Sequence, residues 1–380
     1  MKWYFKAAAI LTLIVVAGVF TLWFRYREYG VFPDLTQEPK YPDSVLEVVS
    51  QTDYPPGNIA VSGSGRLFFT FHPISSPPAN VLEWVNNKAV PFPNADWQSG
   101  GAEALAFQEV LSMRIDQENH LWVLDNGVHG QGTARILAFD IDTRALVHHH
   151  DFSREIFGFG SHANDFQIRP QGDYIFISDA SLIAKRPALV IYDIANQQAR
   201  RVLEGDESVS PGPYQAVVRG RKMTLFGLFT INPGVDGIAL NQTGDELYFA
   251  AISADYLYKI SVGNLLNSKL SPQELREKVE IVGAKTMTDG MTTDVSGNIY
   301  LSDPEHSAIL TMNPQGKLTT LVKSQKIRWP DGFSFGPDGY LYFTCSALNY
   351  VIGFTQQEWQ EHAPFQIFRF KPEYAGRIGH

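Results

Sequence analysis

The chain has 380 residues, of which 44% are hydrophobic and 13% aromatic, so it is long and apolar enough to bury a sizeable core. Its formal net charge is -9 and no stretch is rich in Lys and Arg, which argues against a nucleic-acid partner. Cys345 is the single cysteine, which excludes an intramolecular disulfide and a multi-cysteine metal site.

The N-terminal segment predicts a transmembrane anchor over residues 1–28. Residues 7–24 form an uninterrupted run of apolar and small side chains, and at a rise of about 1.5 Å per residue this helix would span about 27 Å, enough to cross a hydrocarbon core. Two lysines precede the run and two arginines follow it. We expect the N-terminus in the cytoplasm and the remaining chain in the periplasm or outside the cell.

A cleavable signal peptide is the alternative interpretation of this segment. The apolar part of a signal peptide is usually about 7 to 15 residues long and ends at a cleavage site of small residues. Here the run ends in Leu22, Trp23 and Phe24, which are bulky. We therefore favour an uncleaved anchor, and we expect residues 29–43 to form a tether behind it.

A repeated pattern occupies residues 44–380. Each copy contains a short polar pair, an apolar alternation, a turn with Gly or Asn, and a second alternation with aromatic residues, which is the pattern of a β-hairpin. Six copies begin near residues 57, 111, 164, 236, 289 and 331. A single four-stranded sheet with an apolar face is unstable alone, but six sheets packed radially bury every face. The sequence therefore predicts an all-β fold, a six-bladed β-propeller.

Segments outside the repeats have expected places in this propeller. Residues 44–51 are expected to supply a strand to the last blade and so close the ring, and residues 365–370 are the alternative source of that strand. Residues 199–234 form a long insertion, which we expect to lie over one face of the ring. Ser271 followed by Pro272 predicts the start of a short helix in a second insertion.

Polar residues open the innermost strand in four copies. Asn164, Asp236, Asp289 and Asp331 occupy this position, and Asp165 lies beside the first of them. Because innermost strands line the central channel of a propeller, their oxygen atoms are expected to converge on its axis. Such ligands suit a hard divalent cation such as Ca²⁺, whereas crowded carboxylates could instead serve as general acid or base. The alternative is that each Asp only stabilises its own turn.

Histidines near the expected channel mouth are further candidates. His162 lies two residues before Asn164, and His306 follows Glu305 after another strand. A turn-stabilising role is the alternative for both histidines, and His72 and His129 are weaker candidates. The candidate residues fall into three groups: His162, His306 and Asp331 for catalysis, Asp165 and Glu305 for ligand binding, and Asn164, Asp236 and Asp289 for a metal ion.

Two motifs in the repeats are LWVLD at residues 121–125 and DGIAL at 236–240. They resemble motifs of the major royal jelly/yellow proteins, and the likeness covers about residues 45–355. The resemblance implies a six-bladed propeller related to the gluconolactonase/senescence-marker-protein group, which binds its metal ion with a first-blade Glu plus Asn and Asp from later blades. Here the first blade has Gly57 and Asn58 instead of a Glu, so the implied metal site is incomplete.

The family that the chain resembles is functionally mixed, with members linked to dopachrome conversion, amine binding or nutrition, so the resemblance implies the fold better than the activity. The first expectation is an extracytoplasmic enzyme that acts on a small polar molecule, by lactone hydrolysis with Ca²⁺ or by dopachrome-type tautomerisation. The alternatives are a non-catalytic binder of small amine or aromatic ligands and a scaffold for protein partners. No P-loop, G-x-S-x-G or H-E-x-x-H motif occurs, so a nucleotide cofactor is not expected.

Overall fold

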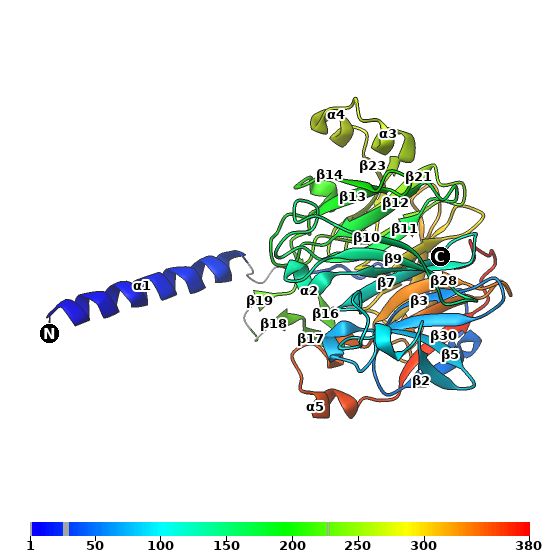
Figure 1. Ribbon diagram of the computed structural model, residues 1–380, viewed down its shortest axis with the longest axis horizontal. Helices are drawn as coiled ribbons and strands as arrows, with labels where there is room; N and C mark the ends of the chain where they lie inside the picture. The colour runs from blue at the N-terminus through cyan, green and yellow to red at the C-terminus, as the bar shows by residue number, and fades with distance from the viewer. Residues whose placement is uncertain (1, 26–29, 226, 228) are drawn as a thin grey trace.

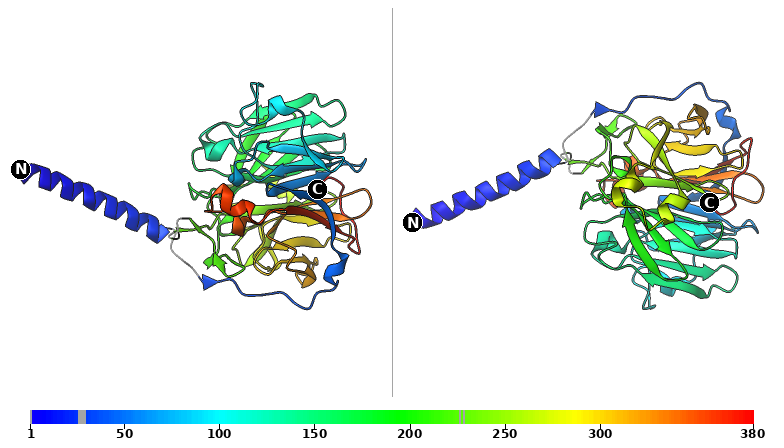
Figure 2. Two further views of the ribbon diagram at one scale, coloured as in Figure 1. Left: turned by 90° about the horizontal axis from the view of Figure 1, so that it is seen from below. Right: turned by 90° about the horizontal axis from the view of Figure 1, so that it is seen from above.

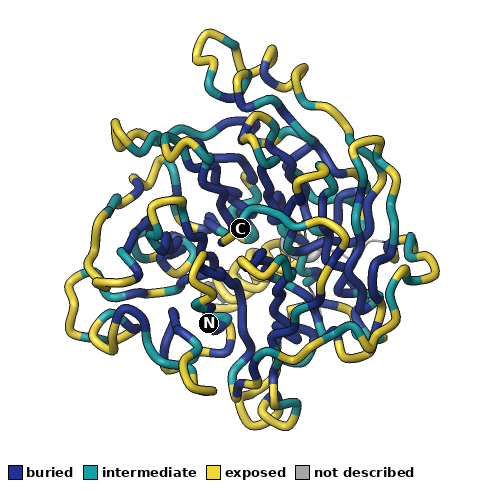
Figure 3. Tube along the Cα trace, turned by 90° about the vertical axis from the view of Figure 1, so that its right-hand side faces the viewer, coloured by how far each residue is buried: buried dark blue, intermediate teal, exposed yellow. Residues whose placement is uncertain are grey.

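The computed structural model describes residues 2–25, 30–225, 227 and 229–380, and six four-stranded antiparallel sheets form a ring within it (Figure 1). Each sheet is one blade. The first strands of the six blades pack against one another around the central axis. Buried residues concentrate in these strands, whereas exposed residues lie mostly in the peripheral turns (Figure 3). This arrangement confirms the six-bladed β-propeller that the repeats predict.

Blades 1 to 3 consist of β3 (Pro56–Val61), β4 (Leu67–Phe71), β5 (Val81–Val85) and β6 (Lys88–Pro91); β7 (Val110–Ile115), β8 (His120–Asp125), β9 (Arg135–Asp140) and β10 (Leu146–Asp151); and β11 (Ala163–Ile168), β12 (Tyr174–Asp179), β13 (Ala188–Asp193) and β14 (Gln198–Val202). Blades 4 to 6 consist of β20 (Val235–Leu240), β21 (Glu246–Ala251), β22 (Tyr256–Ser261) and β23 (Glu280–Ala284); β24 (Met291–Thr293), β25 (Ile299–Asp303), β26 (Ala308–Met312) and β27 (Leu318–Lys323); and β28 (Pro330–Phe335), β29 (Leu341–Cys345), β30 (Phe365–Phe370) and β2 (Glu47–Thr52).

The last blade closes the ring with strands from both ends of the repeat region. β2 pairs antiparallel with β30, which pairs in turn with β29. Both segments that the sequence offered for closure therefore belong to this blade, β30 as its third strand and β2 as its outermost strand. Joining distant parts of the chain in one sheet leaves the ring without an open end between its first and last blades.

The helix α1 (Lys2–Arg25) projects from the propeller on the side where the loops of the long insertion lie (Figures 1 and 2). Its segment Tyr4–Thr21 has a mean hydropathy of 1.9 and is 0% buried. This length and composition are those of a membrane-spanning anchor or of a signal sequence. The expected boundary between anchor and tether, at residues 28 and 29, lies outside the described residues.

Residues 30–43 were expected to be a tether, but the structure shows that they pack along the propeller. β1 (Gly30–Val31) pairs in parallel with β15 (Tyr214–Gln215), and the Phe32 side chain is buried. Farther along, the backbone N–H groups of Lys40 and Tyr41 donate to carbonyl oxygens of β27. Burial of an aromatic ring and backbone pairing fix this segment, so it does not behave as a free linker.

The long insertion lies between blades 3 and 4 and contains several short two-stranded pairings. They are made by β15, β16 (Val217–Val218), β17 (Arg221–Lys222), β18 (Thr224–Leu225) and β19 (Phe229–Thr230). The other short elements are α2 (Gly127–Gly130), α3 (Val262–Leu266), α4 (Pro272–Arg276), α5 (Gln356–Gln360) and the 3-10 turns at Asp43–Val45, Pro73–Ser75, Ala95–Trp97, Glu207–Val209 and Leu348–Tyr350. Ser271 caps α4 together with Glu274, as the sequence predicts for a helix start there.

A C-terminal segment, residues 376–380, crosses the end of the channel that faces away from α1 (Figure 3). Ile115 of blade 2 donates its N–H to the Gly379 carbonyl, and Arg377 donates to the Ile168 carbonyl of blade 3. Ile378 forms a bridge with Phe335 of blade 6. The segment thus connects blades 2, 3 and 6 at this end of the channel.

Candidate functional site

β-bulges position the polar side chains at the channel mouth, the end where the first strand of each blade begins. The pairing register shifts after Ala163, Val235 and Pro330. A bulge leaves a residue out of the ladder and re-aims its side chain. In these three blades the bulge includes Asn164, Asp236 and Asp331. These polar side chains come together at the channel mouth because each lies in the bulge at the start of its blade's first strand.

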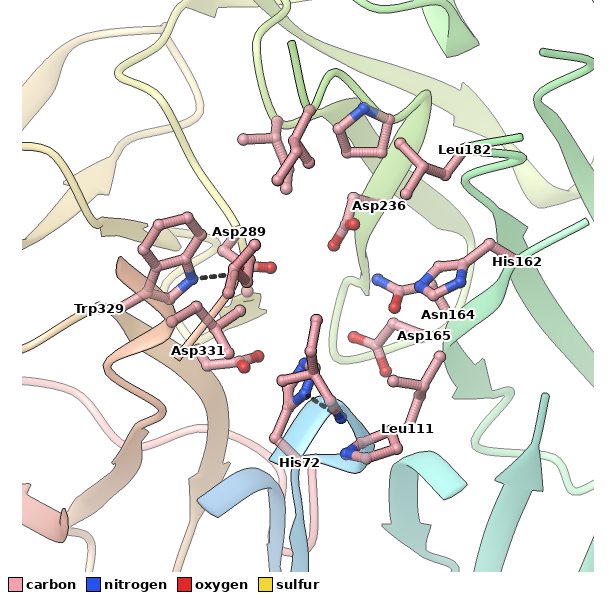
Figure 4. Close-up of a pocket in the computed structure, with 18 of the residues that line it drawn as sticks. His72, Leu111, His162, Asn164, Asp165, Leu182, Asp236, Asp289, Trp329 and Asp331 are labelled. Atoms are coloured by element: carbon pink, nitrogen blue, oxygen red, sulfur yellow. Dashed lines mark hydrogen bonds between the residues drawn. The ribbon is translucent and has the colours of Figure 1, made fainter. Parts of the chain in front are cut away.

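These side chains form the floor of a cavity of about 450 Å³ at the mouth (Figure 4). Carboxyl groups of Asp165, Asp236, Asp289 and Asp331 and the amide of Asn164 lie around one central space. The walls above them are mainly apolar and come from four blades and from the insertion. They include Leu111, Leu182, Ala216, Met223, Ile231, Pro233, Ile252, Trp329, Leu348 and Ile352.

Asp236 and Asp289 form a buried carboxyl pair on this floor. Burial raises the pKa of Asp236 well above its ordinary value, and the neighbouring carboxylate of Asp289 raises it further. Burial also raises the pKa of Asp289, but the Trp329 indole N–H, which donates to Asp289 Oδ2 at 2.6 Å, favours its ionised form. Because the indole hydrogen bond stabilises an ionised Asp289, we expect a proton kept by the pair to lie on Asp236.

Asp331 is a third buried acid on the floor. Burial raises its pKa well above the ordinary value, and the carboxylates of Asp289 and Asp165 raise it further. The hydroxyl of Ser346 and the guanidinium of Arg114 act in the opposite direction. A carboxyl group in these surroundings can keep a proton near neutral pH, as a general acid requires.

The fourth acid, Asp165, is paired with a buried arginine that the sequence analysis missed. Arg114 Nη2 donates to both Asp165 oxygens at 2.8 and 2.7 Å, and Arg114 Nη1 donates to Asn58 Oδ1 at 2.7 Å. The Arg114 residue is only 1% exposed. The Arg114 guanidinium thus neutralises the charge of Asp165 inside the protein. Asp165 was expected to bind ligand, and the structure shows that its carboxyl group also forms this structural ion pair.

A signal for Arg114 does exist in the repeats. The pairing of the first two strands in each blade identifies the positions equivalent to Arg114. The other five blades have small or uncharged residues there: Ala60, Gln167, Ala239, Thr292 and Ser334. An arginine at this position of one blade indicates that its side chain has a specific partner, because an unpaired buried charge is strongly unfavourable.

Three histidines line the mouth above the acids. His162 is the predicted one, and the weaker candidates His72 and His129 join it. His129 Nδ1 and His162 Nδ1 are 2.9 Å apart, and the two rings are stacked. Burial lowers the pKa of His162 well below its ordinary value, and the nearby histidines lower it further. Burial also lowers the pKa of His72 to about 4, so both rings are neutral bases at physiological pH.

Glu305 and His306 were expected at the channel mouth, but the structure does not bring them to this cavity. Glu305 accepts the backbone N–H of Val217 at 2.6 Å, and His306 Nδ1 lies 2.9 Å from the buried Asp303 carboxylate. Glu305 therefore anchors the insertion, and His306 caps the turn that follows its strand. The turn-stabilising alternative describes His306 better than a catalytic role does.

The raised pKa of Asp236 predicts a pH-dependent effect on stability. A carboxyl group whose pKa is raised in the folded state binds its proton more tightly there than in the unfolded chain. Its contribution to the free energy of unfolding is therefore present at low pH and is lost as the pH rises from about 4 through the raised pKa. We expect Asp236→Asn to raise the melting temperature at pH 8 and to change it little at pH 4. The exposed Asp245→Asn variant is the control, and an equal shift at both pH values would contradict the assignment.

The fold places the chain in a class of six-bladed propellers for which solved structures exist. A luciferin-regenerating enzyme aligns with a TM-score of 0.57 over 88% of this chain and 97% of its own, at 12% identity. Regucalcin from Agrobacterium tumefaciens, described as a calcium-binding protein, aligns with a TM-score of 0.56 over 89% and 97%, at 14% identity. A gluconolactonase from Xanthomonas campestris aligns with a TM-score of 0.54 over 86% and 89%, at 11% identity. These likenesses show the fold alone.

The family model described as major royal jelly protein matches residues 108–349, well over half of the chain, and the chain belongs to this family. Major royal jelly protein 9 of Apis mellifera is 21% identical over an alignment of 230 positions, which covers 56% of this chain and 52% of that protein. Major royal jelly protein 3 of Apis mellifera is 23% identical over an alignment of 269 positions, which covers 65% of this chain and 47% of that protein. The chain spans about half the length of the relatives it matches, and the resemblance recognised in its motifs is confirmed.

Proposed function

We propose that this chain is a membrane-anchored, extracytoplasmic enzyme that acts on a small polar molecule in the central cavity. The observation that carries the proposal is the buried carboxyl pair Asp236–Asp289, whose pKa values are both raised by burial, at the floor of a pocket large enough for a small ligand. Buried groups with raised pKa values in a cavity are typical of sites for acid–base chemistry or cation binding. The apolar α1 supports the anchored location.

The donor set at the floor fits a hard divalent cation such as Ca²⁺. Asn164, Asp236 and Asp289 offer oxygen atoms, and Asp331 lies beside them (Figure 4). A cation would take the place of the shared proton and relieve the repulsion that raises both pKa values. Among the described residues, no group of three or more His, Cys, Asp and Glu side chains is arranged to hold a metal ion, so binding would require the amide of Asn164 and an adjustment of the acids.

Lactone hydrolysis is the reaction that the cavity supports best if a divalent cation binds there. A bound divalent cation would supply Lewis-acid polarisation of a substrate carbonyl. The neutral imidazole of His162 lies in the same cavity and can accept a proton from an attacking water, and the carboxyl group of Asp331 can return one to the leaving oxygen. Proton transfer between these two groups would equally serve a tautomerisation of dopachrome type.

A turnover assay with the full chain in detergent tests this proposal. We expect hydrolysis of small lactones, followed as acid release, to require Ca²⁺, to stop with a chelator, and to fall by at least about 100-fold in Asp331→Asn because a general acid is lost. The exposed Asp245→Asn variant is the control. A folded, Ca²⁺-loaded protein that hydrolyses none of a broad set of lactones would exclude this reaction.

A second candidate function, capture of a small organic ammonium ion, is favoured by the cavity walls. Met223, Ile231, Leu348 and Trp329 surround an anionic floor, so one ligand could place its ammonium group on the acids and its apolar body against these side chains. Such a binder would need the same carboxylates without any turnover. This is the non-catalytic alternative among the expectations drawn from the sequence.

A further inference from the structure

Exposed apolar side chains surround the mouth of the cavity. We call them the mouth rim; each is between 37% and 68% exposed: Val31, Ile74, Val128, Phe159, Leu225 and Phe354. Val31 lies in β1, which pairs with the insertion, and the others lie on loops that enter or leave blades at the mouth or in the insertion itself. Ile74 also lines the cavity. Large apolar side chains gathered around one opening indicate a surface that contacts something other than water.

The covalent chain holds this face close to the end of α1. The helix ends at Arg25, and Gly30 is already paired with Tyr214 of the insertion. Five peptide steps separate Arg25 from Gly30, and an extended chain covers at most about 17 Å in that number of steps. Figures 1 and 2 show α1 leaving on the side of β16 to β19. A membrane that contains α1 must therefore lie within reach of the mouth rim.

Three arginines on the same face carry charge that no carboxylate neutralises. Arg219 donates to the carbonyl oxygen of Gln325 at 2.6 Å, Arg221 to that of Ile352, and Arg328 to that of His362 at 2.7 Å. Salt bridges within the described part of the chain involve none of the three. All three side chains are half-buried. These three guanidinium groups therefore keep their positive charge beside the mouth, although the whole chain has a net charge of -9.

We propose that the mouth rim and these arginines dock onto the anionic headgroup surface of the membrane that α1 spans. Apolar side chains at the rim would enter the boundary between headgroups and acyl chains, and the guanidinium groups would face lipid phosphates. The cavity then opens toward the bilayer surface, so its ligand is an amphipathic molecule that partitions into the interface. This inference rests on the proposed membrane anchor.

Site-directed fluorescence on the full chain tests the docking. Cys345 is buried and burial raises the pKa of its thiol to about 12, so an introduced cysteine can be labelled selectively. Phe159→Cys and Phe354→Cys place a label on the mouth rim. Val295→Cys is the matched control, because Val295 is 66% exposed, as Phe159 is at 68%, and lies in a turn at the opposite end of the channel. The chains are reconstituted into equimolar phosphatidylcholine–phosphatidylglycerol vesicles that contain a headgroup nitroxide quencher.

We expect the two rim labels to lose most of their fluorescence and the Val295 label to keep its own. We also expect the quenching to decrease when phosphatidylglycerol is omitted; equal quenching in neutral vesicles would overturn the role of the arginines. Unquenched rim labels on chains that float with the vesicles would overturn the docking while leaving the anchor intact. Chains that fail to float would overturn the anchor, and the docking with it.

Discussion

Replacement of Arg114 with leucine is expected to lower the free energy of unfolding by about 3–5 kcal/mol. The guanidinium donates to both oxygens of Asp165 and to Asn58, and all three residues are buried. Without Arg114 the Asp165 carboxyl group stays in a low-dielectric environment with no cation beside it, so it must remain protonated or unfold the surrounding strands. Denaturant unfolding at neutral pH measures the loss.

The double variant Arg114→Leu/Asp165→Leu separates the ion pair from simple loss of packing. Replacing a buried ion pair by apolar side chains of similar size is often neutral, so the double variant should regain most of the stability lost in Arg114→Leu. Arg114→Leu within about 0.5 kcal/mol of the native protein would show that the pair does not contribute to the fold as described.

Replacement of Asp289 with asparagine is expected to weaken the affinity for Ca²⁺ by at least about 30-fold, which corresponds to about 2 kcal/mol. Asparagine keeps an oxygen that can accept the Trp329 indole hydrogen bond, so the fold should persist, but the site loses the carboxylate that is the ionised member of the pair. Calorimetric titration of the full chain gives the two affinities.

Asp245→Asn is the matched control for this comparison, since Asp245 is an exposed aspartate in the turn between β20 and β21, at the other end of the channel. It should bind Ca²⁺ as the native chain does. Unchanged affinity in Asp289→Asn would place any bound ion outside the cavity and remove Asp289 from the metal-ligand set.

The sequence predicts the ring well because the relevant information is local and repeated. Every blade has two period-2 strands joined by a tight turn, and each copy can be recognised without knowing what it contacts. The polar residues Asn164, Asp236, Asp289 and Asp331 could be predicted to converge because they occupy one position of the repeat. Because the blades are arranged around one axis, residues at the same position of each repeat lie at equivalent places around the channel.

Features that depend on irregular connections could not be predicted in the same way. Glu305 and His306 follow a strand, but the insertion that folds over them determines where their side chains point. Residues 30–43 contain one Gly and three Pro residues, yet Phe32 is buried and fixes them against the propeller. Arg114 was detectable from the repeat alignment, whereas its partners became evident only from the assembled channel.

Calorimetric titration of Ca²⁺ into the full chain, in buffers of different ionisation enthalpy, tests whether a cation replaces a proton held by Asp236 and Asp289. We expect one ion per chain and a release of protons that decreases as the pH rises through the raised pKa values, because metal ligands must be deprotonated. Absence of Ca²⁺ binding, or binding without any proton release, would contradict it.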